Sequence, residues 1–262
     1  MIFIKRSVQV RFQKKAWLRK KFRLVDLASN AKKRSSLIGE LAAIPSWLTS
    51  MLVAHGHQKC WYCERKLPRS ELVIEHFRPK RRVTNVQGHP GYYWLSANIK
   101  NFRIACKNCN CRWTNPNGVV AGKGNYFPLI DETKRVSVRN KDLRAEEPLL
   151  YDPLCQADCE GLIFVEDGSC LPAADDYVEV NRAFSSIALY NLNNPSLVDA
   201  RKKIFGDVYL QARLASSIRL TDPHLFSEAI NNIRVKAQES SEYASLVRST
   251  IRKINSNLGV CI

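Results

Sequence analysis

The stretch IEHFRPK, residues 74–80, decides the fold expected for this chain. With the two residues before it, it predicts a strand over 72–77, because β-branched and aromatic residues dominate it. The strand ends on the carboxylate of Glu75 and the imidazole of His76, and proline and cationic residues follow at once. A carboxylate offers oxygen to Mg²⁺ or Mn²⁺, and an imidazole can act as a general base near neutral pH. The same pair is also compatible with a structural role, as a surface glutamate beside a core histidine.

Two Cys-x-x-Cys pairs flank this stretch: Cys60 with Cys63, and Cys106 with Cys109. Two residues between the sulfurs let a tight turn present both thiolates to one ion, so each pair suits half of a tetrahedral zinc site. The pairs lie farther apart than in common zinc fingers, but the cost of closing a loop grows only slowly with its length. We therefore predict one structural zinc ion held by all four sulfurs, with four unrelated buried cysteines as the alternative.

The chain has nine cysteines in all, an odd number in a sequence without a recognisable signal peptide, which argues against a disulfide framework. Cys111 is close enough to Cys109 to compete as a ligand but is expected to remain unbound. The group Cys155, Cys159 and Cys170 is expected to consist of packing thiols rather than a second metal site.

The charge balance is strongly basic, with 41 Lys and Arg against 24 Asp and Glu and a net charge of +17. This charge favours a polyanionic partner, most simply nucleic acid, over a generally basic surface without a specific partner. No apolar run is long enough to cross a membrane, so we expect a cytoplasmic protein with no membrane partner.

The pattern divides the chain into a basic helical segment over 1–59, a cysteine-bearing core over 60–130 and a loop-rich, then helical, region over 131–262. In the first segment a helix is expected over 35–54, with a break or a new first turn at Pro45. The cations of this segment either contact phosphate or form a solvated helix face, and the pattern does not separate the two.

The last region is expected to contain short strands over 136–138 and 162–165, followed by helices. Asn194–Pro195 and Asp222–Pro223 are predicted helix starts, with Asn194 as the N-cap of the first, and a final helix is expected over 242–254.

The order of these motifs resembles that of HNH endonucleases, in particular the PtuB-type HNH proteins of Septu and retron-linked antiphage systems. The resemblance covers about residues 55–205. The motifs that carry it are Cys-x-Tyr-Cys at 60–63, Ile-Glu-His-Phe-x-Pro-Lys at 74–80, Tyr-Trp-Leu at 93–95 and Asn-Phe-Arg-Ile-Ala-Cys-x-x-Cys-Asn at 101–110.

This resemblance implies an α+β fold whose zinc-stapled ββα-metal (HNH) core is flanked by helical segments on both sides. His76 would be the general base that activates water. Glu75 and Asn110 would bind a catalytic Mg²⁺ or Mn²⁺ ion. Asn101 would tie the intervening loop in place, with Asn98 as the alternative for that position.

The chain departs from the resemblance at one position, because relatives usually carry a lysine three residues after Asn110 and this chain has Trp113. The neighbouring Arg112 could supply the missing cation. Arg78 and Lys80 are further candidate contacts to phosphate.

The function implied is that of a metal-dependent HNH endonuclease that hydrolyses phosphodiester bonds as the effector of an antiphage system. The implied partners are nucleic acid, an ABC-type ATPase of the PtuA kind and, in retron-linked systems, a reverse transcriptase with its RNA/DNA hybrid. DNA is the favoured substrate, while tRNA and other RNA stay open. The alternative is a non-catalytic zinc module that binds nucleic acid or docks on the ATPase. A third possibility, compatible with the nuclease, is a structural subunit whose helices over 181–262 clamp the ATPase.

Overall fold

The structure is a computed structural model, and most of the basic segment over 5–42 lies outside the residues that it describes, so the helices predicted there stay a prediction. The described residues are 1, 3–4, 20–21, 23–25, 30, 33, 36–37, 39–40, 43–114, 118, 120–137 and 142–258.

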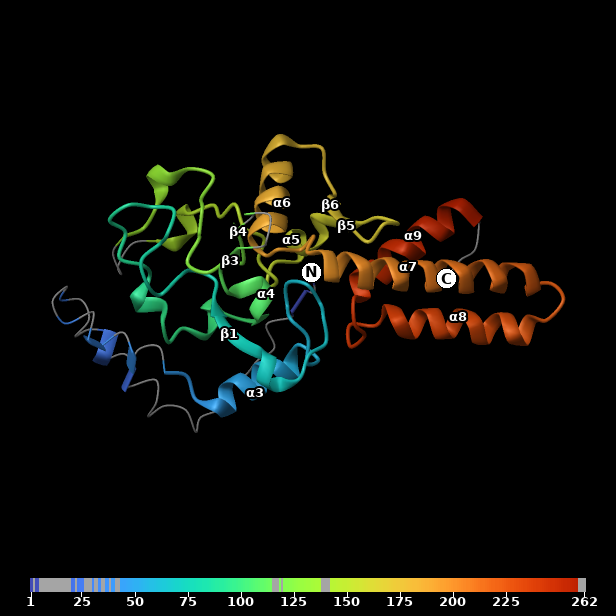
Figure 1. The fold of residues 1–262 in the computed structure, drawn as a ribbon, viewed down its shortest axis with the longest axis horizontal. Coiled ribbons are helices and arrows are strands. Elements are labelled where there is room, and N and C mark those ends of the chain that lie inside the picture. Colours follow the sequence, from blue (N-terminus) through green and yellow to red (C-terminus); the bar gives the residue numbers. More distant parts are fainter. Residues whose placement is uncertain are drawn as a thin grey trace.

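Within the described residues the fold combines helices with three small two-stranded antiparallel sheets, which confirms the α+β class. Figure 1 shows their arrangement. The elements are α3 (Ser46–His55), β1 (Leu72–His76), β2 (Phe102–Cys106), α4 (Lys107–Asn110), β3 (Trp113–Thr114), β4 (Val120–Ala121), α5 (Gln156–Glu160), β5 (Leu162–Phe164), β6 (Cys170–Pro172), α6 (Tyr177–Leu189), α7 (Pro195–Ile218), α8 (Pro223–Ala237) and α9 (Ala244–Leu258).

The hairpin of β1 and β2 organises the cysteine-bearing part of the molecule. Its antiparallel register pairs Leu72 with Cys106 at one end and His76 with Phe102 at the other. Helix α4 begins directly after Cys106, so the chain forms a strand–strand–helix unit with one cysteine at its corner.

Helix α3 covers the hairpin and starts immediately after Pro45, whose φ of −61° suits a helix N-terminus. The proline therefore marks a new first turn, one of the two outcomes expected for it. Leu48 and Leu52 form the buried face of this helix.

The helix starts predicted in the last region are confirmed. The side-chain oxygen of Asn194 accepts a hydrogen bond from the Ser196 N–H at 3.0 Å and caps α7, and the carboxylate of Asp222 accepts one from the Leu225 N–H at 2.9 Å and caps α8. Strand β5 lies within the predicted range. The strand expected over 136–138 is wrong at 136 and 137, because the Val136 N–H donates to a buried carboxylate instead of a strand partner.

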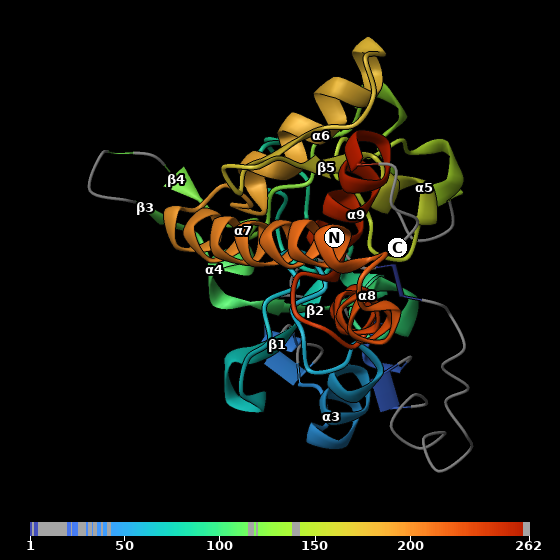
Figure 2. The ribbon, with the colours of Figure 1, turned by 90° about the vertical axis from the view of Figure 1, so that its right-hand side faces the viewer.

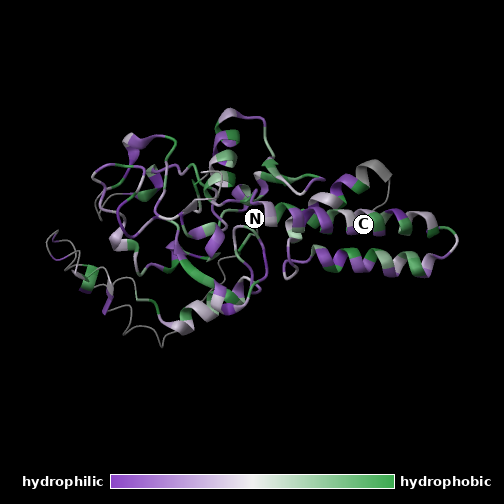
Figure 3. Ribbon diagram, in the orientation of Figure 1, coloured by the Kyte–Doolittle hydropathy of each residue, from purple (hydrophilic) through white to green (hydrophobic). Residues whose placement is uncertain are grey.

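Helices α7 and α8 run side by side away from the part that holds the sheets, and α9 packs against both (Figures 1 and 2). Helices α7 and α8 each carry hydrophobic and hydrophilic residues (Figure 3). The apolar faces of α7, α8 and α9 meet in a small separate core, which contains Val208, Ala212, Ile233, Val247 and Ile254. Among the described residues, none of these helices combines the length and the apolar character needed to cross a bilayer.

The main hydrophobic core draws on all three regions of the chain, since Leu52, Phe102 and Leu192 belong to one buried cluster. The turn between α8 and α9 also reaches back to the first cysteine pair: the Lys59 ammonium donates to the Ser241 carbonyl at 2.8 Å, and the Lys66 N–H donates to Glu242 at 3.0 Å. The helical region thus helps to fix the cysteine-bearing turn.

Candidate metal and catalytic site

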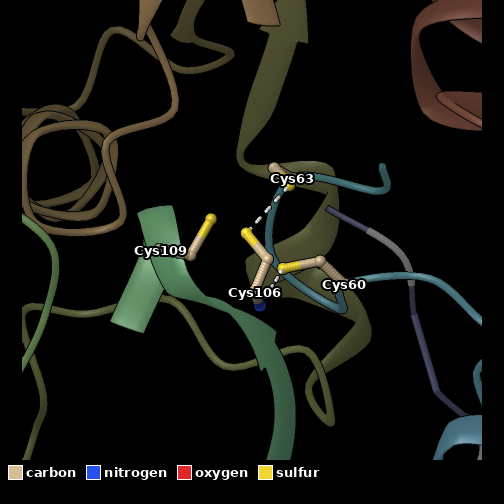
Figure 4. Close-up of side chains that lie close together, drawn as sticks. All are labelled: Cys60, Cys63, Cys106 and Cys109. Carbon is tan, nitrogen blue, oxygen red and sulfur yellow. Dashed lines mark hydrogen bonds between the residues drawn. The ribbon is translucent and has the colours of Figure 1, made fainter. Parts of the chain in front are cut away.

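The four paired cysteines come together at one corner of the β1–β2 hairpin (Figure 4). Cys60 and Cys63 lie in the turn after α3, while Cys106 ends β2 and Cys109 lies in α4. All four are buried, and their sulfur atoms lie within 4.8 Å of one another. The Cys63–Cys106 sulfur distance is 3.9 Å. In a tetrahedral zinc site with Zn–S bonds of about 2.3 Å, neighbouring sulfur atoms lie about 3.8 Å apart. The observed distance is close to that value, so the cluster could hold a metal such as zinc.

One thiol of this cluster, that of Cys106, is favoured as an anion by its neighbours. Hydrogen bonds from Cys109, Cys60 and Cys63 lower the pKa of Cys106 well below its usual range. Burial raises the pKa of Cys60, and hydrogen bonding to Cys106 raises the pKa of Cys109. A metal ion bound by the cluster would favour the thiolate form of these sulfurs by its positive charge. Cys111 is exposed and is not a member of the cluster.

Cys155, Cys159 and Cys170 also remain apart from any group of metal ligands found among the described residues. Cys155 is exposed and Cys170 is buried.

Glu64 closes the turn of the first cysteine pair. Its N–H donates to the Cys60 carbonyl at 2.9 Å, and its φ of 64° lies in the left-handed region that usually requires glycine. Its buried carboxylate lies 3.1 Å from the Met1 amino group and 3.6 Å from the Lys59 ammonium, and accepts a hydrogen bond from the Ser245 N–H at 3.2 Å. Burial alone would raise the pKa of Glu64, but the two cations outweigh it and lower the pKa to about 2.

His76 is the last residue of β1 and is only 7% exposed. Its Nε2 lies 3.1 Å from the Ser96 carbonyl oxygen. Because a carbonyl can only accept, Nε2 carries the proton and Nδ1 is left as an acceptor. The Lys80 ammonium lies 3.4 Å from Nδ1. Burial and the Lys80 charge lower the pKa of His76 to about 3, so the ring is neutral at ordinary pH.

Glu75 has different neighbours from those of His76, as expected for adjacent residues on a strand. Its Oε2 accepts a hydrogen bond from the Tyr62 hydroxyl at 2.6 Å, and its Oε1 forms an ion pair with the Lys123 ammonium at 2.6 Å. The Tyr62 ring is itself fixed by stacking on Tyr190. The glutamate carboxylate is therefore buried between the Tyr62 hydroxyl and the Lys123 ammonium.

The sequence analysis missed Lys123, which joins the two catalytic candidates. Besides its ion pair with Glu75, its ammonium donates to the His76 carbonyl oxygen at 3.2 Å. Burial lowers the pKa of Lys123, and the charge of Glu75 opposes that shift. No motif singles this residue out, because a fully buried lysine looks like any other in a chain with many cations.

The asparagines differ in what they contact. Buried Asn101 accepts a hydrogen bond from the Arg78 N–H at 2.8 Å and donates to the Arg78 carbonyl at 2.9 Å. Asn98 is exposed and caps the short turn over 99–101. Asn110 is half-buried at the end of α4.

The candidate phosphate contacts also differ. Arg78 is held by Glu146 at 2.7 Å, and its side chain is 17% exposed. Arg112 is exposed at the surface, where its guanidinium donates to the Gly122 carbonyl at 2.9 Å and lies over the Tyr126 ring. Lys80 is half-buried beside His76.

The oxygen donors of Glu75 and Asn110 have the hard character that Mg²⁺ and Mn²⁺ prefer. In the described arrangement, however, each carboxylate oxygen of Glu75 already has a protein partner. The chemistry of the donors fits a divalent ion, whereas the carboxylate is not open to one.

No family model matches this chain. It is similar to Septu protein PtuB of Bacillus mycoides (strain KBAB4), with 29% identity over 205 residues that cover 75% of this chain and 60% of that protein. It is also similar to Septu protein PtuA of the same strain, with 24% identity over 164 residues, or 61% of this chain and 21% of that protein. The chain thus spans only part of the length of either relative, and the similarities support a Septu protein of the PtuB type.

Proposed function

We propose that this chain is the nuclease of a Septu-type antiphage system and that it hydrolyses phosphodiester bonds with His76 as general base. The observation that carries the proposal is the orientation of the buried His76 imidazole, with Nε2 on the Ser96 carbonyl and Nδ1 facing the Lys80 ammonium. The similarity to PtuB supports the defence role.

In this proposal the strand–strand–helix unit of β1, β2 and α4 is the HNH core. Cys106 and Cys109 bracket the start of α4, so zinc bound by the cysteine cluster would fix the helix that carries Asn110. Asn101 has the loop-tying role, since it bonds both polar backbone groups of Arg78.

The reaction would begin with a water molecule beside His76. Nδ1 accepts a proton from the water while the water oxygen attacks phosphorus, and the bond from phosphorus to the leaving oxygen breaks. In this step the Lys80 ammonium, which lies beside Nδ1 in the free protein, would pair with a phosphate oxygen instead and leave Nδ1 to the water. Mg²⁺ or Mn²⁺, with Glu75 and Asn110 as proposed ligands, would supply stabilisation of the charge on the phosphate and the leaving oxygen.

The proposed substrate is DNA, with RNA such as tRNA as the second choice, since a basic chain suits either backbone. Arg112 and Lys80 are the proposed phosphate contacts. An ABC-type ATPase of the PtuA kind is the proposed partner in a cytoplasmic complex. In a retron-linked system, a reverse transcriptase with its RNA/DNA hybrid would be a further partner.

A non-catalytic zinc module is the second candidate function, and the pairing of Glu75 with Lys123 and Tyr62 favours it. Such a module would keep the cysteine cluster and the basic surface without chemistry. Cleavage by the purified protein separates the two functions.

The test is cleavage of duplex DNA and of tRNA by the zinc-loaded protein, alone and with its ATPase partner, in Mg²⁺, in Mn²⁺ and in EDTA. We expect breaks in one of the two substrates only when a divalent ion is present. Intact substrates under every condition would leave the non-catalytic module as the better account.

A further inference from the structure

The Lys123 ammonium lies directly against the Glu75 carboxylate. Its side chain is fully buried, and its ammonium lies 2.6 Å from Oε1 of Glu75, whose own side chain is 2% exposed. The Tyr62 hydroxyl holds the other oxygen at 2.6 Å. One hydroxyl therefore donates a hydrogen bond to Oε2, while Oε1 has an internal cation beside it but no hydrogen-bond donor among the described residues.

The backbone brings Lys123 to this place through the helix that carries Asn110. The Lys123 N–H donates to the Cys109 carbonyl at 2.9 Å, and the Gly124 N–H donates to the Asn110 carbonyl at 2.6 Å. Glycine on both sides permits this approach: Gly122 has a φ of 84°, and a Cβ there would lie 1.8 Å from the Cys111 carbonyl oxygen. The lysine thus bridges the segments that hold the two proposed metal ligands.

A buried ammonium and a buried carboxylate depend on each other, because either one alone would be an uncompensated charge in a dry interior. A divalent ion on Glu75 would compete with the ammonium for the same oxygen. An ammonium and a divalent ion beside the same buried oxygen would repel each other strongly at that separation, which favours occupation by one of them.

We propose that Lys123 is the resident cation of Glu75, that a divalent ion binds Glu75 only by displacing the Lys123 ammonium, and that Lys123 thereby sets the metal affinity of the catalytic centre. The inference rests on the proposed function, because it concerns the ion of the proposed nuclease. Lys123 is accordingly a positioning residue rather than a catalytic residue.

The test measures binding of Mn²⁺ to the zinc-loaded full chain from the electron paramagnetic resonance signal of free Mn²⁺. Lys123→Met keeps the length of the side chain and removes its charge, so we expect Mn²⁺ to bind about tenfold more tightly or better. Glu75→Gln should abolish the tight site in either background. Lys59→Met is the matched control, because Lys59 is equally buried but pairs with Glu64, and it should leave Mn²⁺ affinity unchanged.

A second measurement uses the wild-type chain and does not depend on a variant that folds. The buried Lys123 ammonium should give a protected nitrogen signal in NMR spectra, and Mg²⁺ should remove that protection as the ammonium leaves Glu75.

The outcomes separate the inference from the proposed function. If Mn²⁺ binding requires Glu75 but Lys123→Met does not tighten it, or if Mg²⁺ leaves the ammonium signal unchanged, the inference fails and the metal site stands. If neither the wild-type chain nor Lys123→Met binds Mn²⁺ through Glu75, the proposed metal site fails as well.

Discussion

Asn101 holds both polar backbone groups of Arg78: it accepts from the Arg78 N–H at 2.8 Å and donates to the Arg78 carbonyl at 2.9 Å. These bonds join the start of β2 to the chain that leaves β1, two residues after His76. The imidazole therefore stands on a segment that is fixed from both strands of the hairpin.

Replacing Asn101 with Ala should loosen the segment that follows His76. Two partly buried hydrogen bonds are lost and the Arg78 backbone groups lose their Asn101 partners, so we expect a loss of about 1–3 kcal/mol in the free energy of unfolding. Cleavage should fall at least about tenfold, because small displacements of a catalytic group are costly. Asn98→Ala is the control, since Asn98 is exposed and only caps a short turn. Equal effects of the two changes in denaturant unfolding and cleavage would refute the role of Asn101.

Zinc content should depend on the clustered cysteines alone. We expect about one zinc per chain by elemental analysis, because four sulfurs complete a tetrahedral site. Cys106→Ser should lose the ion and unfold the cysteine-bearing part, whereas Cys111→Ser, at an exposed thiol, should retain it. A second zinc per chain, or zinc retained by Cys106→Ser, would contradict this site.

Glu64→Gln should destabilise the protein strongly. The change removes the anion that faces buried Lys59 and leaves that lysine uncompensated, so we expect a loss of about 3–5 kcal/mol in the free energy of unfolding. Glu242→Gln is the matched control, because Glu242 accepts one exposed hydrogen bond, from Lys66, and should cost little. Urea unfolding of the zinc-loaded proteins gives both values, and similar midpoints for the two variants would count against a structural role of Glu64.

Arg112→Ala should weaken binding to nucleic acid without changing the fold. Arg112 is exposed near the end of α4. If it contacts one phosphate, its loss should make the plot of log affinity against log salt concentration less steep by about one unit of slope. Arg144→Ala is the control, because Arg144 is also exposed but already pairs with the Asp142 carboxylate. Filter binding of DNA over a range of salt concentrations provides the slopes, and an unchanged slope for Arg112→Ala would remove it from the contact surface.

Local patterns in the sequence predicted the parts of the fold that depend on near neighbours. The clustering of four cysteines followed from their spacing, and the starts of α7 and α8 followed from Asn194 and Asp222, each before a proline. The strand expected at Val136 failed because a tertiary hydrogen bond to Glu146 takes its N–H.

The parts that could not be predicted depend on contacts between distant segments. The pairing of Glu75 with Lys123 joins residues that no motif connects, and their burial is a property of the folded chain. The loop-tying contacts of Asn101 were expected only from resemblance, since a hydrogen bond to the Arg78 backbone leaves no pattern in the sequence.

The most direct test of the central claim compares cleavage by His76→Ala with cleavage by the wild-type protein. Both are measured with zinc bound, in Mg²⁺ or Mn²⁺, on the substrate that the wild-type protein cuts. His89→Ala is the matched control, because His89 is also buried with Nε2 on a carbonyl but lies outside the hairpin. We predict that cleavage falls at least about a hundredfold in His76→Ala, as expected for loss of a general base, and persists in His89→Ala. Cleavage by a folded His76→Ala protein at the wild-type rate would contradict the account.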